Sequence, residues 1–179
     1  MSTASSVTLT AGVALADALR AATGIDAAIK WPNDLVVGRR KVCGILAEAA
    51  AGAGGLHHVI LGYGINVLPA AYPREIADRA TSIETELGRG IDRSAVFAES
   101  LACLGERFRE LAAGGFPAML DRWRSLSPSS VGHPVHVATG SGWAEATTSG
   151  IDADGALLVR TGRGTEPPRR VIAGEVIWR

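Results

Sequence analysis

Residues 30–45, KWPNDLVVGRRKVCGI, decide the fold of this chain of 179 residues. Proline lacks a backbone donor and keeps the preceding residue extended, so Pro32 predicts that a strand ending at Trp31 opens into a turn. The apolar residues that follow predict a second strand, and Gly38 predicts its reversal into a third. This arrangement brings four polar side chains to one side of a sheet. They are Lys30, Asn33, Asp34 and Lys41.

This polar set suits a reaction that joins an acid to an amine through a phosphorylated intermediate. An ammonium group such as that of Lys41 is a point charge that stabilises negative charge growing in a transition state. The Asp34 carboxylate can accept a proton from an incoming amine or hold the amine in line. Each feature also has an ordinary explanation, because PND is a common turn and charged residues of a hairpin are usually solvated. A lone tryptophan more often packs in a core than it recognises a ligand.

A second glycine-rich segment, GYGIN at residues 62–66, lies at a predicted strand end. Gly62 and Gly64 permit the backbone to approach a flat or charged ligand closely. Asn66 offers both a donor and an acceptor, the pair needed to bind the edge of an adenine ring. Taken by itself, the segment is better explained as a bulged strand.

Helical periodicity surrounds these predicted strands. Apolar residues recur at helical spacing in residues 7–23, and Gly24 marks the end of that helix. After an irregular stretch at 69–92, the helical period returns at 94–113 and 116–126, with a break, GGFP, that is typical of helix ends. These helices need a sheet to cover, and the strands joined as hairpins predict an antiparallel or mixed sheet within an α+β fold.

The pattern of apolar residues changes at about residue 127. Residues 127–134, SPSSVGHP, have the composition of a linker. Beyond them the apolar period is close to two, with turns at 140–142 and 152–155, which predicts four or five short strands in a small SH3-like β-barrel. The sequence therefore predicts a larger domain at 1–127 and a small barrel at 128–179.

Composition excludes several classes of protein. The 18 Lys and Arg balance the 18 Asp and Glu, and no basic patch for nucleic acid is visible. Cys43 and Cys103 lie far apart, and the histidines at 57–58, 133 and 136 do not lie among cysteines or carboxylates at ligand spacing. Neither a disulfide framework nor a metal site is expected. A signal sequence and a long apolar window are both missing, so we expect a reducing cytoplasm and no membrane span.

Several runs of residues together resemble the catalytic core of biotin protein ligases. They are KWPNDLVVGRRKVCGILAEA at 30–49, VILGYGINV at 59–67, RW at 122–123, GIDADGALLV at 150–159 and AGEV at 173–176. The resemblance covers nearly the whole chain. It implies a catalytic domain at 1–127, with a mixed sheet and helices related to class II aminoacyl-tRNA synthetases and lipoate ligases, followed by an SH3-like barrel at 128–179.

The resemblance also implies a reaction with ATP and biotin as substrates, and with Mg²⁺ accompanying ATP. The carboxylate of biotin attacks the α-phosphate of ATP and gives biotinyl-5′-adenylate. A lysine of a biotin carboxyl carrier domain, from acetyl-CoA carboxylase or a related carboxylase, then attacks that mixed anhydride. No acidic cage for the metal is evident in the sequence.

The family pattern implies two catalytic residues, Lys41 and Asp34. Lys41 would contact the biotin carboxylate and the phosphate, and Asp34 would orient or deprotonate the acceptor lysine. Other positions would orient the acceptor, line the pocket, keep backbone close to the ligand or contact adenine. These substrate-binding positions are Lys30, Trp31, Asn33, Gly44, Gly64 and Asn66.

The sequence departs from the family pattern in three ways. A Gly-x-Gly-Arg loop upstream of the first helix is not found in the 179 residues, and GRGTE at 162–166 lies in the barrel. We therefore expect the catalytic domain to be N-terminally truncated, with exposed sheet edges that favour association and leave a homodimer open. Tyr63 is expected to narrow the side of the site that binds the nucleotide. No winged-helix domain is present, so DNA binding is not expected.

Two alternatives to a complete ligase stay open. The first is a catalytically impaired, truncated remnant that binds the carrier domain. The second is a lipoate or octanoate transferase of the same fold, which the Trp-Pro-Asn-Asp block at 31–34 argues against.

Overall fold

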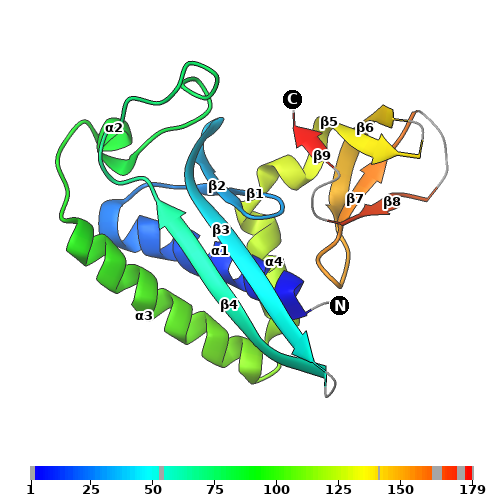
Figure 1. Cartoon of the computed structure of the whole chain (residues 1–179), viewed down its shortest axis with the longest axis horizontal. Helices are drawn as coiled ribbons and strands as arrows, with labels where there is room; N and C mark the ends of the chain where they lie inside the picture. Colours follow the sequence, from blue (N-terminus) through cyan, green and yellow to red (C-terminus); the bar gives the residue numbers. More distant parts are fainter. Residues whose placement is uncertain (1–2, 53–54, 141, 163–166, 173–175, 179) are drawn as a thin grey trace.

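The computed structural model of the chain describes residues 3–52, 55–140, 142–162, 167–172 and 176–178 (Figure 1). Parts of two runs noted in the sequence lie outside these residues, namely most of GRGTE and the first three residues of AGEV. The described chain forms two sheets with helices against the larger one, which confirms the predicted α+β fold. No described helix has the length and apolar character needed to span a membrane.

Helix α1, Thr3–Thr23, forms the centre of the larger unit. Its alanines and aliphatic residues are buried on the side that faces the sheet, as Leu15 and Leu19 show. The helix ends where predicted, because Gly24 adopts a φ of 80° and its N–H donates to the Arg20 carbonyl oxygen at 2.9 Å.

The larger sheet has four strands in the order of the sequence. They are β1 (Ala28–Lys30), β2 (Asp34–Val37), β3 (Arg40–Gly52) and β4 (Gly55–Ile65). Each neighbouring pair is antiparallel, and Gly38, with a φ of 60°, makes the predicted reversal between β2 and β3. Of the two predicted arrangements, antiparallel or mixed, the described strands adopt the antiparallel one, and parallel pairing is limited to an isolated bridge between Lys41 and Ala80.

Three further helices complete the larger unit. They are α2 (Ile83–Leu87), α3 (Arg93–Ala112) and α4 (Phe116–Leu126). The sequence predicted the two longer helices, and it missed α2 in the stretch expected to be irregular. Figure 1 shows α1 and α4 passing behind the sheet and α3 running alongside β4, so that no helix covers the front face of β3 and β4.

The smaller unit has one sheet of five described strands in the order β8-β7-β6-β5-β9. They are β5 (Val131–Thr139), β6 (Gly142–Ile151), β7 (Leu157–Arg160), β8 (Arg169–Val171) and β9 (Val176–Trp178). The described strands form an open sheet, so the closed barrel that was predicted is not present among them. The expected linker is also wrong, because a 3₁₀ turn at Pro128–Ser130 leads directly into β5, and Ser127 and Ser130 are buried.

The two units meet at the turn that follows β6. The Asp152 carboxylate accepts from the N–H groups of Asp154 and Ala156, which fixes this predicted turn. At its end the Gly155 carbonyl oxygen accepts from the Trp31 indole N–H at 3.1 Å. Gly155, 124 positions from Trp31 in the sequence, thus holds the segment at residues 30–34 that carries Lys30 and Asp34.

Candidate functional site

The structure brings together the charged residues that the sequence singled out. Lys30 lies opposite Asp34 in the register of β1 and β2, and Asp34 lies opposite Gly44 in that of β2 and β3. The Lys41 ammonium is 2.5 Å from the Asp34 carboxylate, Nζ to Oδ1. Lys41 is about half exposed, so the pair lies at the surface of the sheet where a ligand can reach it.

Glycines make room for this ion pair and for a ligand beside it. A Cβ atom at Gly44 would lie 2.9 Å from Nζ and Cε of Lys41, so Gly44 accommodates the lysine side chain rather than keeping its own backbone free for a ligand. On the adjacent strand Gly64 lies opposite Gly44, and nothing of the protein occupies the space above it. Gly62 lies opposite Leu46 in the same way. These glycines leave the front of the sheet shallow at this point.

Two apolar side chains flank the glycines on the same uncovered face. Leu46 and Ile60 are each 59% exposed, although both belong to central positions of long strands. Residues that alternate with them, such as Ile45, are buried against the helices. The face therefore offers a ligand an apolar surface next to a cation, which suits a molecule with an apolar body and a carboxylate.

Trp31 and Asn33 have structural partners that the sequence did not reveal. The Asn33 side chain donates to the Ile45 carbonyl oxygen at 2.7 Å, and the Ile45 N–H donates to the Asn33 carbonyl oxygen at 2.9 Å. Trp31 is buried and donates to Gly155. Both residues also line a cavity of about 320 Å³ between the start of α1, β3 and the smaller unit. Their bonds fix the shape of the segment from which Asp34 projects.

The loop after β4 holds the backbone of Lys41 from the other side. The Lys41 N–H donates to the Arg79 carbonyl oxygen at 2.7 Å, and the Lys41 carbonyl oxygen accepts from Thr81 at 2.9 Å. Asn66, expected to contact adenine, donates its amide N–H to the Thr81 carbonyl oxygen at 3.0 Å. Sequence reasoning missed this role of Arg79 and Thr81, because nothing in the stretch 69–92 marks its backbone as a partner of β3.

The electrostatic balance of the cluster favours an anion. Burial lowers the pKa of Lys30, and the carboxylate of Asp34 opposes that shift. The positive charges of Lys41, Arg79 and Arg39 lower the pKa of Lys30 further, in that order. Three cationic groups and one carboxylate thus act on Lys30, and an oxyanion that binds there relieves the repulsion between the cations.

Tyr63, which was expected to narrow the side of the site that binds the nucleotide, lies on the face of the sheet opposite to the glycines. It alternates with Gly62 and Gly64 along β4, and its hydroxyl forms a 2.8 Å hydrogen bond with the Ser100 hydroxyl of α3. Because successive side chains of a strand point to opposite faces, glycines on the front place Tyr63 at the back.

The remaining reactive groups near the site do not form a nucleophile or a metal centre. Cys43 is buried, and this burial raises the pKa of its thiol to about 12, so the thiol stays protonated at neutral pH. The described residues contain no group of three or more His, Cys, Asp or Glu side chains that could hold a metal ion.

Comparisons with known families cover both units of the chain. Residues 1–66 match the biotin/lipoate A/B protein ligase family. Residues 131–179 match the biotin protein ligase C-terminal domain.

Individual relatives agree with the family matches. The chain is 36% identical over 160 residues to the bifunctional ligase/repressor BirA of Bacillus subtilis, covering 88% of this chain and 49% of that protein. It is 33% identical over 179 residues to the biotin–acetyl-CoA-carboxylase ligase of Paracoccus denitrificans, covering 96% of this chain and 74% of that protein. The chain thus spans about half the length of the BirA proteins it matches.

Solved structures extend the likeness to the fold. The apo biotin protein ligase of Aquifex aeolicus matches with a TM-score of 0.83 and 28% identity, covering 98% of this chain and 75% of that one. The same ligase in complex with biotin and ATP matches with a TM-score of 0.80 and 27% identity, covering 98% of this chain and 71% of that one.

Proposed function

The chain belongs to the biotin protein ligases of the biotin/lipoate A/B protein ligase family, and on this basis we propose that it is an ATP-dependent biotin ligase. In the proposed reaction the chain activates biotin as biotinyl-5′-AMP. It then transfers the biotinyl group to a lysine of a biotin carboxyl carrier domain.

The observation that carries this proposal is the Lys41–Asp34 ion pair beside the glycines of the uncovered sheet face. A carboxylate oxygen of biotin attacks the α-phosphorus of ATP, the bond from that phosphorus to the bridging oxygen breaks, and pyrophosphate leaves. Negative charge grows on the phosphate oxygens during this step. Lys41 stabilises that charge, because Asp34 holds its ammonium at the surface and two hydrogen bonds hold its backbone.

The second step uses the other member of the ion pair. The amine of the carrier lysine attacks the carbonyl carbon of the mixed anhydride, the bond to the phosphate oxygen breaks, and AMP leaves. The amine must lose a proton during this attack. Asp34 accepts the proton or orients the amine, because its carboxylate is partly exposed beside Lys41.

The other predicted binding positions take supporting parts in this proposal. Lys30 adds positive charge next to Asp34, and Gly64 leaves space for the ligand. Asn66 braces the loop after β4 through its side-chain N–H, and its side-chain carbonyl oxygen is the group we assign to adenine. No residue of the described chain is assigned to Mg²⁺, which we propose enters bound to the phosphates of ATP.

Biotin is the favoured acid over lipoate or octanoate. The residues that form the smaller unit match the C-terminal domain of biotin protein ligases, and the solved relative from Aquifex aeolicus is in complex with biotin and ATP. Competition of lipoate against biotin for adenylate formation tests this choice, and equal use of the two acids would contradict it.

Biotin-dependent exchange between ATP and pyrophosphate by the purified chain tests the activity itself. We expect exchange, and we expect Lys41→Ala to reduce it by about a hundredfold or more, since loss of a single transition-state donor has that size. A folded chain without exchange contradicts the ligase proposal. In that case a carrier-domain binding assay decides whether the chain is a binding remnant.

A further inference from the structure

Helix α2 carries a carboxylate that joins two segments of the chain beside Lys41. The Glu86 side chain is 13% exposed, and its Oε1 atom has two partners. Nη2 of Arg40 lies 2.8 Å from this oxygen as an ion pair, and the Thr81 hydroxyl donates a hydrogen bond to it. Arg40 begins β3, whereas Thr81 belongs to the loop between β4 and α2. A single oxygen atom thus links the start of β3 to that loop.

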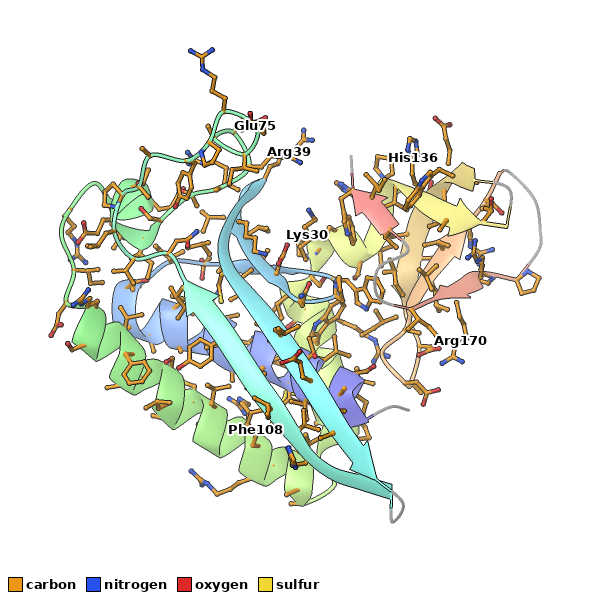
Figure 2. All side chains as sticks on the ribbon, viewed as in Figure 1. Lys30, Arg39, Glu75, Phe108, His136 and Arg170 are labelled. Carbon is orange, nitrogen blue, oxygen red and sulfur yellow. The ribbon has the colours of Figure 1, made fainter. Side chains whose placement is uncertain are left out.

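Both of these segments hold the backbone of Lys41. Arg40 precedes Lys41 in the chain, and the Thr81 N–H donates to the Lys41 carbonyl oxygen at 2.9 Å. Figure 2 shows that the two segments also lie together farther along, since Arg39 of the β2–β3 turn and Glu75 of the loop are at the same end of the larger unit. The carboxylate therefore closes a ring of covalent bonds and polar contacts that contains the Lys41 backbone.

The sheet itself gives this position weak support. The pairing of β3 with β4 begins at Cys43, so Lys41 lies beyond that ladder. On its other side the register of β2 and β3 shifts between Leu35 and Val36, and Val36 is the residue opposite Lys41. A shift of register disrupts the ladder locally. The loop that Glu86 ties to β3 takes the place of the missing strand.

We propose that Glu86 is a positioning residue for the ligase reaction and acts by holding Lys41 in place. The proposal rests on the ligase function above, and in it Glu86 touches no substrate. The Lys41 ammonium must meet negative charge at a fixed place to stabilise it during the transfer. A hydrogen bond from a hydroxyl to a carboxylate is stronger than one to a neutral acceptor, which makes Glu86 an effective brace.

The start of α2 is itself fixed to the end of β4. Ile83 is buried, and its N–H donates to the Asn66 backbone carbonyl oxygen at 2.8 Å. The Glu84 N–H donates to the Val67 carbonyl oxygen at 3.0 Å. A displacement of the Glu86 carboxylate therefore requires either a new side-chain rotamer or a movement of the whole short helix.

Steady-state exchange between ATP and pyrophosphate tests the role of Glu86 in catalysis. We expect Glu86→Ala to lower kcat by about tenfold or more with much less change in the KM for ATP, because the stabilisation lost is that of the transition state. Glu86→Gln should retain most of the activity, since its side-chain oxygen still accepts from the Thr81 hydroxyl. Full activity of Glu86→Ala would overturn the proposal.

Glu84→Ala is the matched control from the same helix. The Glu84 carboxylate accepts from the Ile91 N–H at 3.0 Å, so it holds the segment after α2 and not the segments beside Lys41. We expect exchange at the wild-type rate. Equal losses of exchange in Glu84→Ala and Glu86→Ala would overturn the proposal, because activity would then follow the integrity of α2.

Arg40→Ala breaks the other side of the ring and provides a second variant in case Glu86→Ala does not fold. Arg40 is partly exposed, so we expect the variant to fold. Its exchange should also fall, and the double variant Arg40→Ala with Glu86→Ala should lose no more than Glu86→Ala alone, since both changes break one ring. Fully additive losses would show that the two residues act separately and would overturn the proposal.

Acetylation by a succinimidyl ester reads the position of Lys41 without relying on catalysis. The sequence has two lysines, Lys30 and Lys41, and mass spectrometry follows each. Glu86→Ala should raise the acetylation rate of Lys41 relative to Lys30, because the ammonium leaves Asp34 more often, whereas Glu84→Ala should not. An unchanged ratio in Glu86→Ala would overturn the proposal. A wild-type chain without exchange whose variants show these acetylation rates keeps the brace on Lys41 and loses the ligase proposal.

Discussion

Lys41 and Asp34 form an ion pair, 2.5 Å from Nζ to Oδ1, directly above the bare backbone of Gly44. An exposed pair of this kind contributes about 0–1 kcal/mol to stability. Its importance lies in geometry, since it sets where the ammonium stands on an otherwise uncovered sheet face. Changes that displace the pair should therefore affect catalysis far more than folding.

Gly44→Ala tests whether displacing the ion pair affects catalysis more than folding. The added Cβ would lie 2.9 Å from the end of the Lys41 side chain, which is flexible and moves aside. We expect the free energy of unfolding to change by less than about 1 kcal/mol, and adenylate formation to fall by about tenfold or more, because the ammonium leaves the reacting phosphate.

A glycine of α3 supplies the control for this substitution. A Cβ at Gly105 would meet nothing within 4 Å, so Gly105→Ala should stabilise the helix by about 1 kcal/mol and leave ATP–pyrophosphate exchange unchanged. Wild-type exchange by Gly44→Ala would show that the position of Lys41 does not matter.

Asp34→Asn should separate the two steps of the proposed reaction. The amide keeps the shape of the carboxylate but cannot take a proton from the carrier lysine. We expect transfer from preformed biotinyl-5′-AMP to a carrier domain to fall by about a hundredfold or more, with adenylate formation reduced much less. Single-turnover measurement of each step checks this. Equal losses in both steps would indicate that Asp34 acts only by holding Lys41.

The sequence predicted the parts of the site that depend on local pattern. The Pro32 turn, the Gly38 reversal and the resulting approach of Lys41 to Asp34 follow from turn chemistry and hairpin geometry. The expectation for Tyr63 overlooked strand alternation, which places this side chain on the back once Gly62 and Gly64 lie on the front.

Other features depended on partners distant in the chain. The amide of Asn33 and the indole of Trp31 donate to backbone carbonyls 12 and 124 residues away. Backbone carbonyls have no signature in the sequence, so these contacts could not be read from residue types. The same holds for the Arg79 carbonyl oxygen that braces Lys41.

Gly155→Ala should disrupt the junction between the two units. Gly155 adopts a φ of 81°, and a Cβ there would lie 2.2 Å from the Leu9 side chain of α1. Since Leu9 is buried, the turn must move and its hydrogen bond with Trp31 is lost. We expect a loss of about 3 kcal/mol or more in thermal or urea unfolding.

Gly132→Ala is the matched control for that substitution. Gly132 also has a positive φ, 74°, but a Cβ there would meet nothing within 4 Å. Its expected cost is about 1 kcal/mol, from backbone strain alone. Similar losses in the two variants would show that the contact with Leu9 does not determine the stability of the junction.

Stability above pH 9 should depend on Cys43. The pKa of its thiol is raised from the usual 9.0 to about 12, with burial as the largest cause, while the positive charge of Lys41 opposes the shift and the carboxylate of Asp34 adds to it. Between these values the unfolded chain releases the thiol proton and the folded chain keeps it. The unfolded state then binds fewer protons, so the free energy of unfolding falls as pH rises, by about 1.4 kcal/mol per pH unit at most for this group.

Urea unfolding at pH 8, 9, 10 and 11, pH values chosen to span that window, should show a shallower decline in the free energy of unfolding for Cys43→Ala than for the wild type. Parallel declines would mean that the buried thiol is not the group responsible.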